Sequence, residues 1–275
     1  MSRLKAISLC VVALLALPAM APAVPTIPGA PTEIPELSLQ VWALRSIHEM
    51  ELTPAQLKAF RAAAAPDTAS RMGGAKSKVS EKYVAALHAL RDALLKGDDD
   101  DRITELREDL ETMLEDDEID VNDDIAITAN ARTRTPDLLK MLAPSQVAGY
   151  IAVYQDEIPD PQVLLRVAIE EVRGAEDDDF KSTLDDTTDE VSVLLAGLDI
   201  EKAKPITEQI RAMLKHARDM NDSDFKSKRG DLEADGRKII GDVGPVTVLQ
   251  HWLERDIAEL LSNPQLTSAI DAKSR

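Results

Sequence analysis

The stretch YVAALHALRDALLKGDDDDRITELREDLETML (residues 83–114) decides the fold class of this chain. Apolar residues recur every three or four positions on both sides of KGDDDD (96–101), which is the spacing of one buried helix face. Gly97 is a typical helix stop, and the aspartates after it are typical helix caps. The stretch therefore predicts two helices joined as an antiparallel hairpin. Their apolar positions are Tyr83, Leu87, Leu90 and Leu94, then Ile103, Leu106, Leu110 and Met113.

The composition extends this prediction to the whole chain. Aromatic residues are only 3%, whereas sheets depend on aromatic and β-branched residues. The nearest candidate for a strand, residues 125–128, is too short to build a sheet. We therefore predict an all-α protein of antiparallel helical hairpins, stacked as an irregular repeat array. Each proline after residue 36 is expected at a helix start or break.

An internal repeat supports the helical array. AEDDDFKSTLDD (175–186) aligns with MNDSDFKSKRGD (220–231) at an offset of 45 residues, so that Phe180 corresponds to Phe225. A period of this length with two helices per unit is typical of stacked hairpins. We interpret Phe180 and Phe225 as anchors of each hairpin turn to its own core, with ligand stacking as the alternative. Residues 83–114 read as a weak third copy, and a final helix over 246–260 closes the array.

The beginning of the chain has the features of a secretory signal peptide. MSRLKAISLCVVALLALPAMAPAVP (1–25) combines a basic start, an apolar run too short to span a bilayer and small residues at a cleavage site before Val24. A lipoprotein signal is disfavoured because Cys10 stands at the start of the apolar run. Cys10 is the only cysteine, so the mature chain has no disulfide or thiol site. We therefore expect a periplasmic or extracellular protein.

The chain is then divided by composition and charge. We expect a signal peptide (1–23), a Pro-rich extended leader (24–36), a helical module (37–157) and a hairpin repeat region (158–275). The formal net charge is −18. Such a surface repels nucleic acid and anionic lipid, so we predict neither nucleic-acid binding nor stable membrane insertion after signal cleavage.

Two similar decapeptides, ELTPAQLKAF (51–60) and MLAPSQVAGY (141–150), have the form Leu-x-Pro-x-Gln. In the first, Thr53 can cap a helix, Pro54 takes the first helical position and Gln56 can complete a capping box. The apolar residues on either side of this cap, Leu52 and Leu57, stand at the positions of a hydrophobic staple.

The second copy repeats this pattern with Leu142, Pro144 and Gln146. Ala143 stands where the first copy has its threonine and has no side chain to cap with. The second helix start should therefore be weaker by about 1 kcal/mol.

Paired LTxxQ-like motifs that flank a helical hairpin, behind a signal peptide, resemble the Spy/CpxP-type periplasmic stress proteins. The resemblance covers residues 37–157. It implies a small all-helical unit outside the cytoplasm, with ATP-independent chaperoning, inhibition of signalling or metal sensing as its functions. The chain departs from the family at Ala143, in the long segment between the motifs and in its acidic charge. Residues 158–275 have no counterpart in the family.

The sequence offers little support for a metal site. His48-Glu49-Met50 (48–50) is the most metal-like cluster, although a histidine at a helix end explains it better. The run at 120–124 has the alternate oxygen ligands of a calcium loop. However, Ile125 and Ala131 stand where that loop needs Gly and a bidentate Glu.

The remaining motifs argue against catalysis. The eleven glycines form no phosphate-binding loop or dinucleotide fingerprint, and there is no nucleophile elbow. We predict that the protein is not an enzyme and uses no cofactor. The favoured function is an exported interaction or chaperone-like envelope stress module, with protein partners or self-association. Two alternatives stay open: an acidic protein with weak divalent cation binding, and a structural scaffold.

Overall fold

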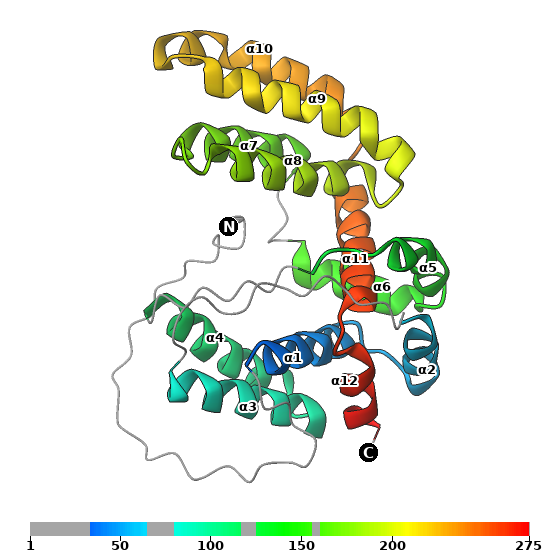
Figure 1. Ribbon diagram of the computed structural model, residues 1–275. Helices are drawn as coiled ribbons and strands as arrows, with labels where there is room; N and C mark the ends of the chain where they lie inside the picture. The colour runs from blue at the N-terminus through cyan, green and yellow to red at the C-terminus, as the bar shows by residue number, and fades with distance from the viewer. Residues whose placement is uncertain (1–33, 65–79, 117–124, 156–159, 275) are drawn as a thin grey trace. The chain divides into compact units, whose positions relative to one another are not determined.

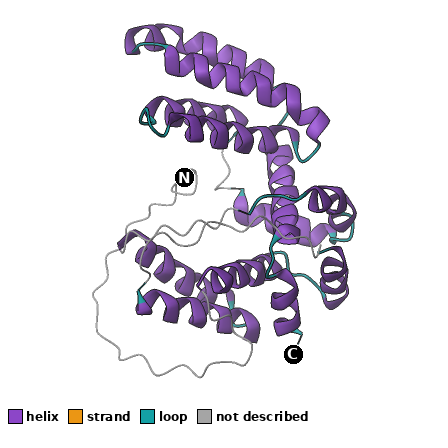
Figure 2. Ribbon diagram, in the orientation of Figure 1, coloured by secondary structure: helices purple, strands orange, loops and turns teal. Residues whose placement is uncertain are grey.

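The fold is entirely helical in the part of the chain that the computed structural model describes. The signal peptide, Cys10 and the run at 120–124 lie outside that part, and α1 begins at Ile34, within the last residues of the expected leader. The prediction of an all-α protein is confirmed (Figure 2). The described ranges are 34–64, 80–116, 125–155 and 160–274.

Twelve helices are present in these ranges (Figure 1). They are α1 (Ile34–Glu49), α2 (Pro54–Ala63), α3 (Glu81–Lys96), α4 (Asp100–Asp116), α5 (Ala129–Leu139), α6 (Pro144–Tyr154), α7 (Pro161–Gly174), α8 (Phe180–Ala196), α9 (Ile200–Asp219), α10 (Asp222–Ile240), α11 (Pro245–Ser262) and α12 (Leu266–Lys273).

The described residues divide into two compact units. The discontinuous unit contains residues 34–146 and 256–274, and the inserted unit contains residues 147–255. Helices α6 and α11 each begin in one unit and end in the other. The last part of the chain therefore completes the same unit as the first part.

Helices α3 and α4 of the discontinuous unit follow directly from their sequence. Ser80 Oγ accepts a hydrogen bond from the Tyr83 N–H (3.2 Å) at the start of α3, and Gly97 ends that helix in a left-handed conformation (φ 72°). Asp99 Oδ1 accepts one from the Arg102 N–H (2.9 Å) at the start of α4. The apolar seam of α3 is buried, and α3 packs along α4. The two helices predicted from residues 83–114 are therefore present.

A buried polar network joins α1, α3 and α12. The side chain of Arg91 is buried, and its Nε donates to Gln40 Oε1 (2.6 Å), whose Nε2 donates to Ser268 Oγ (3.0 Å). Lys273 Nζ donates to the Leu94 carbonyl (2.7 Å). A buried charge is costly unless it is hydrogen-bonded. The network therefore favours one placement of α12 against α1 and α3.

Four helices, α7 to α10, surround one apolar core in the inserted unit. Helix α7 packs on α8 and α9 packs on α10, while α8 and α9 pack closely along each other (Figure 1). Burial of apolar surface is the main stabilising contribution in such a core. Its buried residues include Leu164, Leu165, Ile169, Val191, Leu195, Ile210, Met213, Leu214 and Leu232.

Two prolines differ from the sequence-based expectation. Pro136 lies inside α5 and Pro205 lies inside α9, so the prediction that each later proline marks a helix start or break is wrong for both. A proline within a helix removes one backbone hydrogen bond to the carbonyl four residues earlier. Both prolines are exposed, which leaves room for solvent around the interrupted helix turn.

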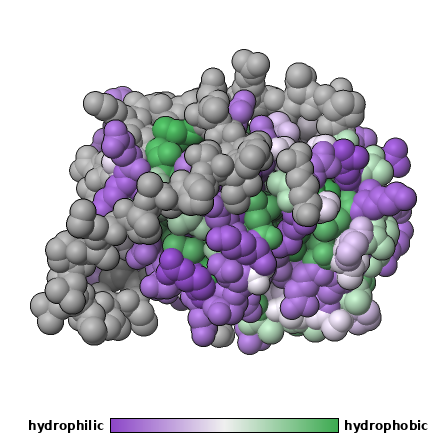
Figure 3. Space-filling model, turned by 90° about the horizontal axis from the view of Figure 1, so that it is seen from below, coloured by the Kyte–Doolittle hydropathy of each residue, from purple (hydrophilic) through white to green (hydrophobic). Residues whose placement is uncertain are grey.

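Hydrophilic side chains cover much of the described surface (Figure 3). None of the helices in the described ranges is both long enough and apolar enough to cross a bilayer. Large hydrophobic side chains are exposed at positions scattered along the chain: Met141, Val153, Val163, Ile200 and Val246.

Candidate functional site

The two Leu-x-Pro-x-Gln motifs meet inside the discontinuous unit, although 90 residues separate their glutamines. Gln56 Nε2 donates to Gln146 Oε1 (2.8 Å), and Gln146 Nε2 donates to Gln56 Oε1 (3.1 Å). Both side chains are buried. We call this reciprocal pair the glutamine joint.

Each glutamine also closes the start of its own helix. The Thr53 N–H donates to Gln56 Oε1 (2.8 Å), and the Ala143 N–H donates to Gln146 Oε1 (2.8 Å). The first copy has a complete capping box, as predicted, with Pro54 at the beginning of α2. The second copy keeps only the glutamine half of the box, because Ala143 has no hydroxyl group.

The same glutamines bind the backbone of the other motif. Gln56 Nε2 donates to the Met141 carbonyl (2.8 Å), and Gln146 Nε2 donates to the Glu51 carbonyl (2.9 Å). Glu51 corresponds to Met141 at the offset that relates the two glutamines, so the contacts are exchanged by an approximate two-fold rotation. The leucines of both motifs, Leu52, Leu57 and Leu142, are buried around the joint's helix starts. Its amide groups are hydrogen-bonded on both sides and do not titrate.

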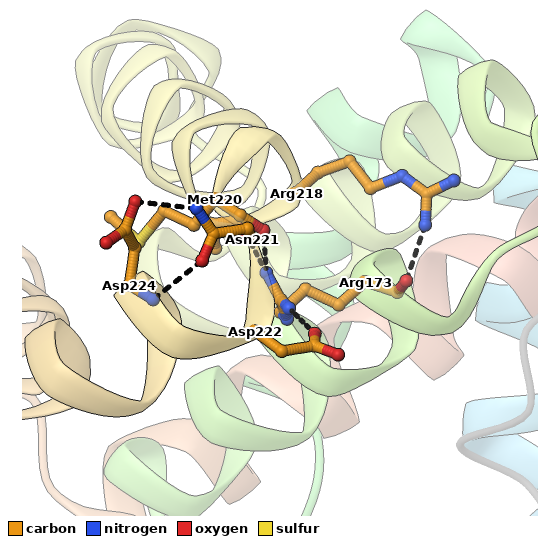
Figure 4. A network of polar contacts seen from close by, with 7 residues as sticks. Arg173, Arg218, Met220, Asn221, Asp222 and Asp224 are labelled. Carbon is orange, nitrogen blue, oxygen red and sulfur yellow. Dashed lines mark hydrogen bonds and ion pairs between the residues drawn. The ribbon is translucent and has the colours of Figure 1, made fainter.

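The repeat of the inserted unit forms a second reciprocal contact (Figure 4). Arg173, at the end of α7, donates to the carbonyls of Ala217 and Met220 at the end of α9. Its Nη2 also pairs with Asp222 Oδ1 (2.8 Å) at the start of α10. The arginine at the end of α7 therefore covers the turn between α9 and α10.

Arg218 makes the equivalent contacts in the opposite direction. It donates to the Arg173 carbonyl and pairs with Asp177 Oδ1 (2.8 Å). Arg218 and Asp222 correspond to Arg173 and Asp177 at the 45-residue offset. We call this reciprocal set the arginine joint.

Phe180 and Phe225 belong to the same joint. The Arg173 guanidinium lies 4.0 Å from the centre of the Phe225 ring, and the Arg218 guanidinium lies 5.5 Å from that of Phe180. Both rings also pack against the apolar core, in agreement with an anchoring role. Each ring, however, also contacts the arginine of the other copy of the repeat. Reciprocal exchange indicates a two-fold relation, whereas stacked repeats are related by translation, so the repeat array is not confirmed.

A shallow groove lies between α7 and α10 in the inserted unit. Its cavity volume is about 30 Å³, far below the roughly 300–1,000 Å³ of sites that enclose small molecules. The α10 positions that line it recur every three or four residues from Phe225 to Ile240, about 22 Å of helix. Its apolar floor is formed by Leu165, Ile169, Met213, Leu232 and Ile240 around Gly236.

Charged side chains form the rim of the groove. Arg166 pairs with Glu233 (3.4 Å), and Arg229 pairs with both Glu233 (3.4 Å) and Glu170 (3.0 Å). Arg237 also lines the groove. Its guanidinium group has no ion pair or hydrogen bond with any residue in the described ranges.

At the 45-residue offset, α7 corresponds to α9 and α8 corresponds to α10. The pair α8 and α9 is therefore equivalent to the pair α10 and α7, and these two helices pack closely together. At the 45-residue offset the rim positions of α10 align with buried positions of α8. Charged residues thus stand on α10 where α8 has buried ones, and α10 packs less closely on α7 than α8 does on α9. The aligned positions are Leu184 with Arg229, Thr188 with Glu233, and Ser192 with Arg237.

The metal-like positions do not assemble into a cluster. His48 Nε2 lies 2.9 Å from Asp100 Oδ1 at the start of α4. Within the described residues, no group of three or more His, Cys, Asp or Glu side chains is placed to hold a metal ion.

Two side chains within the described ranges have a clearly shifted pKa. The hydrogen bond from Arg211 on α9 lowers the pKa of the Asp185 carboxyl group on α8. Burial lowers the pKa of Lys273 at the end of α12. Neither side chain lines the groove, so both shifts reflect helix packing.

Comparison of the chain with protein-family models gives no match, and searches of the curated proteins and of the solved structures give none either.

Proposed function

We propose that this chain is an exported, non-enzymatic helical protein that binds protein partners through the groove between α7 and α10. The apolar floor of that groove beneath a charged rim carries the proposal, because such grooves receive the apolar face of a partner helix. The resemblance of residues 37–157 to Spy/CpxP-type proteins supports a chaperone-like envelope stress role. The signal-like residues 1–23 support a periplasmic or extracellular location.

The small volume of the groove favours a protein over a small molecule as its ligand. A cavity volume of about 30 Å³ leaves most of a small ligand in solvent, whereas small-molecule sites enclose most of theirs. A groove that runs along two helices for several turns is, by contrast, a suitable site for the apolar face of a third helix.

Two glycines of α10 provide a matched test. A Cβ at Gly236 would lie 3.2 Å from Leu165 Cδ1 in the floor of the groove, whereas a Cβ at Gly230 would meet nothing within 4 Å. Gly236→Leu therefore adds a side chain that presses on the floor of the groove and displaces Leu165. Gly230→Leu adds the same side chain at a position of α10 that is open. The measurement is light scattering of an unfolding model client with a stoichiometric amount of each variant.

We expect the wild type and Gly230→Leu to suppress client aggregation and Gly236→Leu to lose most of this effect. Circular dichroism and melting temperature establish that each variant is folded. If Gly236→Leu is unfolded, Gln162→Trp at the exposed end of the groove replaces it. A folded groove-filling variant that protects clients as well as wild type does would refute the role of the groove.

A further inference from the structure

We propose that the groove between α7 and α10 takes an acidic amphipathic helix of a partner protein, an inference that rests on the proposed function. The apolar floor would receive leucine-like side chains, and Arg237 would receive a carboxylate from the flank of that helix. The occupant is therefore defined by shape and by charge.

The shape of the groove fits a helix. Its lining residues on α10 are Phe225, Arg229, Leu232, Glu233, Gly236, Arg237 and Ile240, a single stripe of one helix face. A partner helix that follows this stripe presents side chains at i, i+3, i+4 and i+7 to the floor. At Gly236 the side chain of Leu165 lies so close to α10 that an added Cβ would be 3.2 Å from its Cδ1, so we expect bulky partner residues on either side of this position.

The charge of the rim differs from that of the whole chain. Three arginines and two glutamates line the groove, whereas acidic residues outnumber basic ones by 50 to 32 overall. Both glutamates are already paired with arginines of the rim. Arg237 is the rim cation that the described residues leave without a counter-ion. A partner carboxylate would complete this pairing.

The net negative charge of the protein opposes the binding of an acidic peptide. A net charge of −18 disfavours acidic ligands at long range, and this field is largely screened beyond about 8 Å at physiological ionic strength. An advantage of an acidic peptide over a neutral one must therefore arise from direct contact with the rim.

The experiment measures binding of labelled peptides to the full chain by fluorescence anisotropy at about 150 mM salt. The probe is a helical peptide of about 16 residues with leucines every three or four positions and glutamates on the flanks. A sister peptide has glutamine in place of each glutamate. The variants are Arg237→Gln in the groove and Arg134→Gln, an exposed arginine of α5, as the matched control.

We expect the glutamate peptide to bind wild type about fivefold more tightly than the glutamine peptide. Arg237→Gln should remove this advantage, and Arg134→Gln should preserve it. Gly236→Leu should weaken both peptides, and Gly230→Leu should weaken neither. Equal affinity for the two peptides, with both lost in Gly236→Leu, would overturn the acidic preference and leave the proposed function intact.

Two other outcomes have a different meaning. If Gly236→Leu binds both peptides as wild type does, the groove is not the binding site, and the proposed function fails with the inference. If sedimentation shows a wild-type dimer that Gly236→Leu dissociates, and neither peptide binds, a second copy of the chain occupies the groove, which overturns the partner helix.

Discussion

The glutamine joint and the arginine joint are both reciprocal contacts, but the first is made by neutral side chains and the second by charged ones. In both, two copies of a short motif exchange contacts across an approximate two-fold relation. The glutamine joint is neutral, with Gln56 and Gln146 buried. The arginine joint is charged, and its two aspartates, Asp177 and Asp222, are fully exposed.

The difference shows which physical property sets the strength of a reciprocal contact. A buried amide that loses its partner keeps the full cost of its desolvation, whereas an exposed carboxylate that loses its partner is rehydrated by solvent. The glutamine joint should therefore resist salt and tolerate substitution poorly. The arginine joint should depend on salt and tolerate substitution better.

The largest effect is expected when one glutamine is removed. Gln56→Ala removes the side-chain partner of the Met141 carbonyl and of the Thr53 N–H, and one of the partners of the Gln146 amide. We expect a loss of about 2–3 kcal/mol in the free energy of unfolding. Urea denaturation followed by circular dichroism measures it. Gln250→Ala, at an exposed position of α11, is the control. In a double-mutant cycle the loss for Gln56→Ala with Gln146→Ala should fall short of the sum by about 1 kcal/mol or more. An additive cycle would contradict a direct joint.

The next effect is expected at the arginine joint. Arg173→Ala removes a donor to two carbonyls, a pairing with Asp222 and the contact with Phe225, and we expect a loss of about 1–2 kcal/mol. Part of this loss should disappear when urea denaturation is repeated in high salt, because an exposed ion pair is screened. The loss caused by Gln56→Ala should be the same at both salt concentrations. A salt-independent loss for Arg173→Ala would mean that its backbone contacts dominate over its charge.

The two helix starts of the glutamine joint allow a smaller and symmetrical test. Thr53→Ala removes the hydroxyl half of the capping box and should cost about 1 kcal/mol. Ala143→Thr adds the missing hydroxyl at the corresponding position and should raise the free energy of unfolding by up to about 1 kcal/mol. Thermal denaturation of the two single variants and the double variant compares the copies directly. A destabilising Ala143→Thr would show that the second motif cannot take the geometry of the first.

The smallest effect concerns pH. The hydrogen bond from Arg211 lowers the pKa of Asp185 below its ordinary value of 3.8. A lowered folded-state pKa stabilises the protein above the unfolded-state pKa, and this stabilisation is lost as the pH falls through the folded-state value. Asp185→Asn should therefore be less stable than wild type near pH 6 and approach it near pH 3. A difference that stays constant between these two pH values would argue against the ion pair as the cause.

The local helix signals were predictable because they act over a few residues. Gly97 ends α3, and Thr53 caps α2 with Gln56, for reasons that a window of six residues contains. The prolines at 136 and 205 were not predictable in this way. Whether a proline breaks a helix depends on the packing of the residues around it, which a local window does not show.

The reciprocal contacts could not be predicted from the same windows. The meeting of Gln56 with Gln146 depends on how α1 to α6 pack, and nothing near either motif specifies its partner. The arginine joint left a signal, since Arg173 and Asp177 repeat as Arg218 and Asp222 at the offset of the two phenylalanines. The groove could not be predicted from the sequence, because it is recognised by a difference in burial between aligned residues of α8 and α10.

The return of residues 256–274 to the discontinuous unit has a consequence for the order of assembly. During synthesis, residues 34–146 emerge long before the segment that carries α12, so the polar network around Arg91 stays incomplete until α12 has emerged. The inserted unit, which is continuous in sequence, has no such delay. Since nearby contacts form faster than distant ones, we expect the inserted unit to become protected from hydrogen exchange before the discontinuous unit does.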